Sequence, residues 1–169
     1  MLKQTAHIID TINGLLGRVI SYATFAMALI MFAIVVLRYG FNLGWIAMQE
    51  SVMYLHAAVF LLGSAFTFQQ NGHVRVDVFY RKFSDKQQAK VNLFGSLVFM
   101  LPVSLYIGII CYQYVMDSWQ LFEGSREPGG LPFVYILKSF LLVFAISMTL
   151  QALSDIATQS LKLLQREAK

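Results

Sequence analysis

Four long apolar segments, separated by polar connections, organise the whole chain. Each is close to the length of about 20 mostly apolar residues that a helix needs to cross a hydrocarbon core about 30 Å thick. Period-2 alternation appears only briefly, so no barrel interpretation competes with helices. We therefore predict an all-α integral membrane protein, a single domain over residues 1–169 with four transmembrane helices. The expected spans are residues 19–38, 50–70, 91–114 and 133–154.

Three details refine these spans. Lys138 lies near the start of the fourth, where a lysine side chain can reach the membrane surface. Pro102 lies inside the third, where a kink is expected because neighbouring helices can satisfy the freed backbone groups. Before the first span, apolar residues at helical spacing predict an amphipathic interfacial helix over about residues 2–18. The first apolar segment is long enough to span, unlike the apolar region of a cleaved signal peptide.

Basic residues are distributed unequally among the connections. Ten of the thirteen Lys and Arg residues lie before the first span, in the 70–90 connection or in the C-terminal tail. Four spans place these three regions on the same side of the membrane. Because positive residues resist translocation, we expect this side, with both termini, to be cytoplasmic.

Composition agrees with lipid as the solvent for much of the surface. Hydrophobic residues make up 57% of the chain and charged residues 13%, whereas soluble domains have about 25% charged residues. The net charge of +4 is explained by the basic connections, which can meet anionic membrane lipids, so no nucleic acid partner is required. The single cysteine, Cys111, excludes an internal disulfide and is expected to be a small apolar packing residue.

The most polar stretch near the middle of the chain is "QQNGHVRVDVFYRK", residues 69–82. We interpret it as the start of a cytoplasmic hinge whose charges set the topology, with a turn at Asn71 and the following glycine. His73 and Asp77 have the i, i+4 spacing of some metal-ligand pairs, but no third ligand is close in sequence. The residues assigned to the hinge are Gly72, His73, Arg75 and Asp77.

The centres of the spans contain no Asp, Glu, Lys or Arg, although transport and proton relays place such groups inside the membrane. His56 is the titratable candidate there, and a lone histidine among apolar residues is more often a packing residue than a ligand. No Gly-rich phosphate loop, nucleophile elbow or zinc signature occurs. We therefore predict a protein without enzymatic activity, cofactor or metal that serves a partner. Two alternatives stay open: a haem-binding redox subunit using His56, and a stand-alone small transporter.

The first connection on the outer side joins spans one and two. Arg38 ends one span and Glu50 begins the next, where the helix dipole favours a carboxylate. Glu50 is also expected to pair with Arg38 or Lys138, or to contact a partner subunit. Trp45 suits the aromatic belt at a membrane interface.

The second outer connection, "DSWQLFEGSREPGGLP", covers residues 117–132. It is acidic apart from Arg126 and rich in glycine and proline, which is typical of turns. We regard it as the best candidate for a docking surface on the outer side, with Arg126 and Glu127 as its expected contacts.

Short motifs in a fixed order resemble the small membrane subunit (Q, DctQ-like) of TRAP transporters, the tripartite ATP-independent periplasmic systems. They are "LRYGFN" at residues 37–42, then Trp45 and Glu50, then "GSAFTFQQNGHVRVD" at residues 63–77. The resemblance covers about residues 18–153. The family often has an acidic pair where this chain has Gln49-Glu50, and many members carry a basic residue near Gln69-Gln70.

The resemblance implies a multi-pass protein of the bacterial inner membrane that works with two partners. One is a large multi-span permease that binds substrate and sodium, and the other is a periplasmic substrate-binding protein. The small subunit would be a scaffold and membrane anchor for the permease and would offer part of the docking surface. Implied substrates are organic anions such as C4-dicarboxylates, sialic acid and other sugar acids. The residues expected at the subunit interface are Arg38, Asn42, Trp45 and Glu50.

Overall fold

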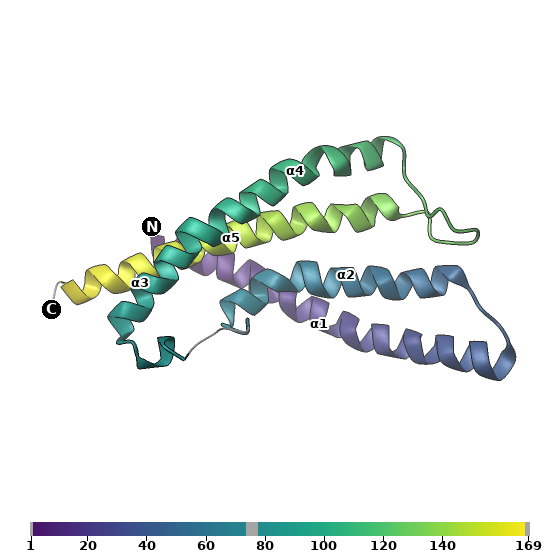
Figure 1. Ribbon diagram of the computed structural model, residues 1–169, viewed down its shortest axis with the longest axis horizontal. Helices are drawn as coiled ribbons and strands as arrows, with labels where there is room; N and C mark the ends of the chain where they lie inside the picture. The colour runs from purple at the N-terminus through teal and green to yellow at the C-terminus, as the bar shows by residue number, and fades with distance from the viewer. Residues whose placement is uncertain (1, 74–77, 168–169) are drawn as a thin grey trace.

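The computed structural model of the chain, shown in Figure 1, describes residues 2–73 and 78–167, and these are helices and connections without a strand. Four helical segments are long and apolar enough to cross a membrane, which confirms the all-α, four-span prediction. The elements in chain order are α1 (Leu2–Phe41), α2 (Ile46–Gln69), the 3₁₀-helix η1 (Tyr80–Lys82), α3 (Asp85–Gly95), the π-helix η2 (Ser96–Met100), α4 (Leu101–Gln120) and α5 (Val134–Glu167).

The third span is one rod made of α3, η2 and α4, and its π-helical turn directly precedes Pro102. There the N–H of Leu101 bonds to the carbonyl of Ser96, five residues earlier instead of four. Proline has no N–H and its ring crowds the carbonyl four residues before it, so the α-helical register is interrupted in this turn. The rod nevertheless continues through Pro102 to Gln120.

Helix α5 is the centre of the bundle, because it packs against α1, α2, α3 and α4. Figure 1 shows α1 with α2 and α4 with α5 as two pairs that diverge toward the ends where the 42–45 and 121–133 connections lie. We call this the loop end, and the opposite end, with both termini and η1, the terminal end. Small residues allow close packing: a Cβ added to Gly17 would lie 2.6 Å from Phe66 Cδ1, and Gly108 faces Ala145.

Helix α1 is continuous through residue 18, so the predicted N-terminal amphipathic segment is not a separate element. Its apolar side, represented by Ile12 and Leu15, is exposed, whereas Asn13 on the polar side is only 3% exposed. The Asn13 amide donates a 2.8 Å hydrogen bond to the Gln151 side chain of α5. Asn13 therefore points into the bundle and Ile12 and Leu15 point outward, an arrangement suited to lipid contact, while His7 and Arg18 are also exposed. Placement of residues 2–18 on the membrane surface stays a prediction.

A residue in the left-handed backbone conformation follows the end of each of three helices. Asn42 and Asn71 both have φ of 53°, a conformation in which asparagine is enriched, and Phe122 has φ of 44°. After Asn71, the N–H of Gly72 bonds to the carbonyl of Thr67 at 2.8 Å, which confirms the predicted turn. A Cβ on Gly72 would lie 3.3 Å from that carbonyl oxygen, so glycine suits this close approach.

Candidate functional site

At the loop end, the carboxylate of Glu50 on α2 binds both sides of the 121–133 connection. One oxygen accepts a hydrogen bond from the Ser125 hydroxyl, and the other accepts from the Leu131 N–H at 2.6 Å. Ser125 and Leu131 are also joined directly, through the Ser125 N–H and the Leu131 carbonyl at 3.0 Å. We call Glu50, Ser125 and Leu131 the loop-end clasp.

These partners of Glu50 differ from the expected ones. The sequence suggested an ion pair with Arg38 or Lys138, but within the described residues the carboxylate is bonded to the loop, and Lys138 pairs with Glu123 instead. The reason is position: the first turn of α2 lies beside the second connection, whose uncapped backbone N–H and hydroxyl are strong partners for a carboxylate.

Gly130 allows the clasp to close. A Cβ built at this position would lie 2.5 Å from Ser125 Cβ and 2.8 Å from Glu50 Oε1, distances that real side chains do not show. The neighbouring Gly129 has φ of 79°, a conformation that favours glycine. The two glycines therefore let the loop fold back tightly against α2.

A second ionic contact fixes the base of the same connection. The Lys138 ammonium of α5 donates to Glu123 Oε2, which also accepts from the Ser118 hydroxyl at 2.7 Å. The ammonium lies 4.0 Å from the centre of the Tyr114 ring, a cation–π distance. The hydrogen bond from Lys138, and after it that from Ser118, lowers the pKa of Glu123 below its ordinary range. Lys138 is thus anchored within the protein by Glu123 and Tyr114.

Aromatic side chains surround this contact. The Tyr135 ring lies 4.7 Å from the Trp119 ring and 5.7 Å from the Phe122 ring, measured between centroids. The Trp119 indole N–H donates to the Ser139 hydroxyl at 2.8 Å. Because Phe122 is itself exposed, the cluster combines a rigid base with an apolar surface that faces outward.

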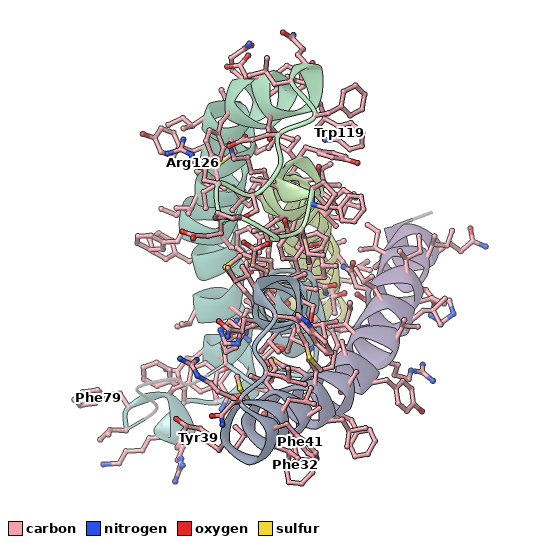
Figure 2. The ribbon with its side chains drawn as sticks, turned by 90° about the vertical axis from the view of Figure 1, so that its right-hand side faces the viewer. Phe32, Tyr39, Phe41, Phe79, Trp119 and Arg126 are labelled. Atoms are coloured by element: carbon pink, nitrogen blue, oxygen red, sulfur yellow. The ribbon has the colours of Figure 1, made fainter. Side chains whose placement is uncertain are left out.

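The predicted interface and docking residues are placed on this end of the molecule. Arg38, Asn42 and Trp45 are exposed at the junction of α1 and α2, while Glu50 is half-buried in the clasp. Arg126 and Glu127 are both exposed on the clasped connection. Figure 2 views the molecule from the loop end and shows Arg126 and Trp119 at different sides of this connection.

The predicted hinge residues are only partly described. Gly72 completes the turn after α2, and His73 is exposed with its ring 6.0 Å from the Phe68 ring. Arg75 and Asp77 lie outside the described residues, so their predicted roles stay predictions. Farther along, Phe79 is exposed beside η1. Among the described residues, no group of three His, Cys, Asp or Glu side chains could hold a metal ion.

His56, the residue on which the haem alternative depends, lies on an exposed part of α2. Its ring centroid is 4.5 Å from that of Phe60, one helical turn away. This tilted contact between neighbouring rings is typical of packing on a helix surface.

Polar side chains of α1, α2 and α5 form a cluster at the terminal end, in which Gln151 and Ser154 are buried and Asp10 is half-buried. Asp10 Oδ1 accepts from Gln151 at 3.1 Å and from Ser154 at 2.8 Å, and the Asp10 carbonyl accepts from Gln69 at 2.9 Å. These bonds join α1, α2 and α5 through buried and half-buried side chains, and polar contacts between helices hold membrane bundles together. In the sequence, the helical spacing of Asp10 and Asn13 indicates that both lie on one face of α1. The sequence does not indicate that α5 packs against that face.

A second part of the terminal-end cluster joins η2 to α5. The Ser96 hydroxyl donates to Asp155 Oδ2 at 2.5 Å, and Gln159 donates to Asp155 Oδ1 at 2.9 Å. Ser96 is 2% exposed and sits in the π-helical turn, where its backbone is displaced from the α-helical register. Polar contacts therefore fasten both ends of the bundle. The Thr149 hydroxyl also donates to the Ser104 hydroxyl at 3.0 Å between α5 and α4, and the centres of the spans carry no Asp, Glu, Lys or Arg.

Comparison with known proteins decides the family. Residues 27–161 match the family model described as the DctQ component of tripartite ATP-independent periplasmic transporters. The chain belongs to the DctQ family. It is also 30% identical over 131 residues to a Haemophilus influenzae protein whose name assigns it to the TRAP transporter small permeases, covering 73% of this chain and 76% of that protein. No solved structure is a significant match.

Membership confirms the resemblance inferred from the motifs. This chain is a small permease subunit of a TRAP transporter, a multi-pass membrane protein in a family of transporter components rather than enzymes. As a DctQ component of a tripartite system, it is one part of a larger assembly.

Proposed function

We propose that this DctQ subunit is a scaffold and membrane anchor for the large permease of its transporter, in the bacterial inner membrane with both termini in the cytoplasm. The observation that supports this role is the distribution of polar groups. They fasten helix to helix at the two ends, through Glu50 and Glu123 at one and Asp10 and Asp155 at the other. The centres of the spans offer no charged group with which to bind an anion.

The loop end forms part of the docking surface for the periplasmic binding protein. The clasp holds the 121–133 connection in one conformation, so Arg126 and Glu127 are presented without a large ordering cost on binding. Charges at the rim of an interface steer the association of two proteins. Because the clasp holds this loop in place, Arg126 and Glu127 can steer the binding protein toward one orientation.

The complete transporter takes up an organic acid together with sodium. The substrate is a C4-dicarboxylate, sialic acid or another sugar acid, and both substrate and sodium are bound by the large permease. The small subunit supports this uptake by holding the static part of the permease in the bilayer.

Purification of the chain from its own host in mild detergent tests the scaffold role. We expect it to co-purify with the large permease and to give sodium-dependent uptake in proteoliposomes only when the permease and the binding protein are also present. If the chain is recovered without the large permease from a host that expresses both proteins, the scaffold role is refuted. A Soret absorbance band in the purified protein that disappears in His56→Ala would instead favour the haem alternative.

A further inference from the structure

A long groove runs along α5 and the α3–η2–α4 rod on the side that α2 leaves uncovered. Its volume is about 1120 Å³. Lining residues on α5 extend from Phe144 to Lys162, which is about 27 Å at 1.5 Å per residue. The groove therefore begins inside the expected fourth span and extends past its expected end at residue 154, and residues within 79–88 of the middle connection also line it.

The lining changes character along the groove. Toward the middle of the bundle it is apolar, and several of these side chains are uncovered, with Phe99 62% and Val103 53% exposed. Toward the terminal end it is polar, with amide, hydroxyl and carboxylate groups and the ammonium group of Lys162. The polar lining residues include Gln69, Asn92, Ser96, Asp155 and Gln159. A partner that fits this gradient is apolar for most of its length and polar at one end.

The carboxylates at the polar end of the groove can accept more hydrogen bonds than they do within this chain. Asp10 and Asp155 both line the groove, and their carboxylates accept hydrogen bonds from neutral side chains: Gln151 and Ser154 for Asp10, Ser96 and Gln159 for Asp155. Within the described residues, neither carboxylate has a cationic group at ion-pair distance. Each carboxylate can accept about four hydrogen bonds, and a partly buried carboxylate is strongly stabilised by a cation.

The change from apolar to polar lining and the two carboxylates together favour an occupant that is apolar along most of its length and carries a basic group at one end. We propose that this groove seats a transmembrane helix of the large permease, with a Lys or Arg side chain of that helix directed at Asp10 and Asp155. The inference rests on the proposed scaffold function and assigns the helix face that performs it. Contact along Phe99, Val103 and Phe144 supplies apolar packing, while the basic residue fixes the depth of the helix by charge complementarity.

Photo-crosslinking within the assembled complex tests the position of the partner. Val103→p-benzoylphenylalanine places a photoreactive group in the groove, and Leu105→p-benzoylphenylalanine is the matched control. Leu105 lies on the same helix with 47% exposure and is not a lining residue of the groove. After irradiation of the co-purified complex, we expect peptides of the large permease to be joined to position 103 and not to position 105. A phospholipid adduct at 103, or permease adducts at 105 in equal or greater yield, would overturn the proposal.

Two charge-neutralising substitutions test whether the permease directs a basic side chain at this carboxylate. Asp155→Asn should reduce the amount of permease recovered per subunit by at least about tenfold, because it removes one member of a partly buried charge pair. Asp117→Asn makes the same chemical change at the far end of α4, where Asp117 bonds to Gln113, and should leave recovery unchanged. Equal recovery with both variants would remove the ionic part of the proposal.

These results separate the inference from the proposed function. If the chain co-purifies with the permease but crosslinks to it only from position 105, the scaffold function holds and the groove assignment is wrong. If no permease co-purifies, the scaffold function itself is wrong.

Discussion

The carboxylate of Glu50 accepts a 2.6 Å hydrogen bond from the backbone N–H of Leu131, although 81 residues separate them. This bond, with the one from Ser125, joins the first turn of α2 to the connection between α4 and α5. The two halves of the bundle diverge toward this end, so the clasp is the polar link that holds their loops together (Figure 1).

Glu50→Ala should loosen the loop end. It leaves the Leu131 N–H without its acceptor, and a hydrogen bond to a charged group contributes about 2 kcal/mol. We expect a lower unfolding temperature in detergent and faster proteolysis within residues 121–133. Recovery of the permease complex should also fall. Glu50→Gln keeps one acceptor oxygen and should be intermediate; equal behaviour of the two variants and the native chain would contradict the clasp.

Gly130→Ala should disturb the same contact by crowding. The added methyl group would lie 2.5 Å from Ser125 Cβ, so the loop must move away from α2 at a cost of about 2 kcal/mol. Gly44→Ala is the matched control, because a Cβ there meets nothing within 4 Å. Thermal unfolding of both variants should show a loss of stability for Gly130→Ala alone. A similar loss in both would indicate a general effect of replacing loop glycines.

The Glu123–Lys138 contact predicts a pH dependence. The folded protein lowers the pKa of Glu123 below 4.5, chiefly through the hydrogen bond from Lys138, so the unfolded chain binds this proton more tightly. The stabilisation is therefore complete above pH 4.5 and is lost as pH falls through the lowered pKa. Unfolding temperatures measured from pH 7 to pH 3 should fall less steeply for Glu123→Gln than for the native chain. Parallel curves would show that this carboxyl contributes nothing.

Arg126→Glu should affect docking and not assembly. Arg126 is exposed on the clasped connection, so reversal of its charge leaves the helix contacts unchanged while it alters steering of the binding protein. We expect a lower association rate, measured by surface plasmon resonance at low ionic strength, and a smaller difference at high salt. Normal recovery of the permease complex is the control. Unchanged association would remove Arg126 from the docking surface.

Much of the architecture could be predicted from hydrophobic pattern alone, because the cost of exposing backbone groups to lipid requires each apolar segment to be helical. The helix ends could not be predicted in this way. Helix α5 continues to Glu167, beyond the expected end of its membrane span at residue 154, because helical hydrogen bonds need no apolar side chains. The π-helical turn before Pro102 was likewise expected only as a kink.

The polar contacts were harder to predict. The N-terminal segment was expected to be an amphipathic helix that lies on the membrane surface, yet its polar residue Asn13 is buried against Gln151. In a membrane bundle, the apolar side can face lipid and the polar side can hold helices together, which inverts the usual interpretation. The Glu50 clasp was missed because nothing local in the sequence indicates that the first turn of α2 adjoins the 121–133 connection.

Reconstituted uptake tests the central claim, that this subunit braces a transporter and does not itself carry solute. Proteoliposomes should contain this chain alone, the large permease alone, or both, each with the binding protein and labelled organic acid outside and a sodium gradient. The account predicts sodium-dependent uptake only with both membrane subunits. Accumulation of the acid by vesicles that contain this chain alone would contradict it.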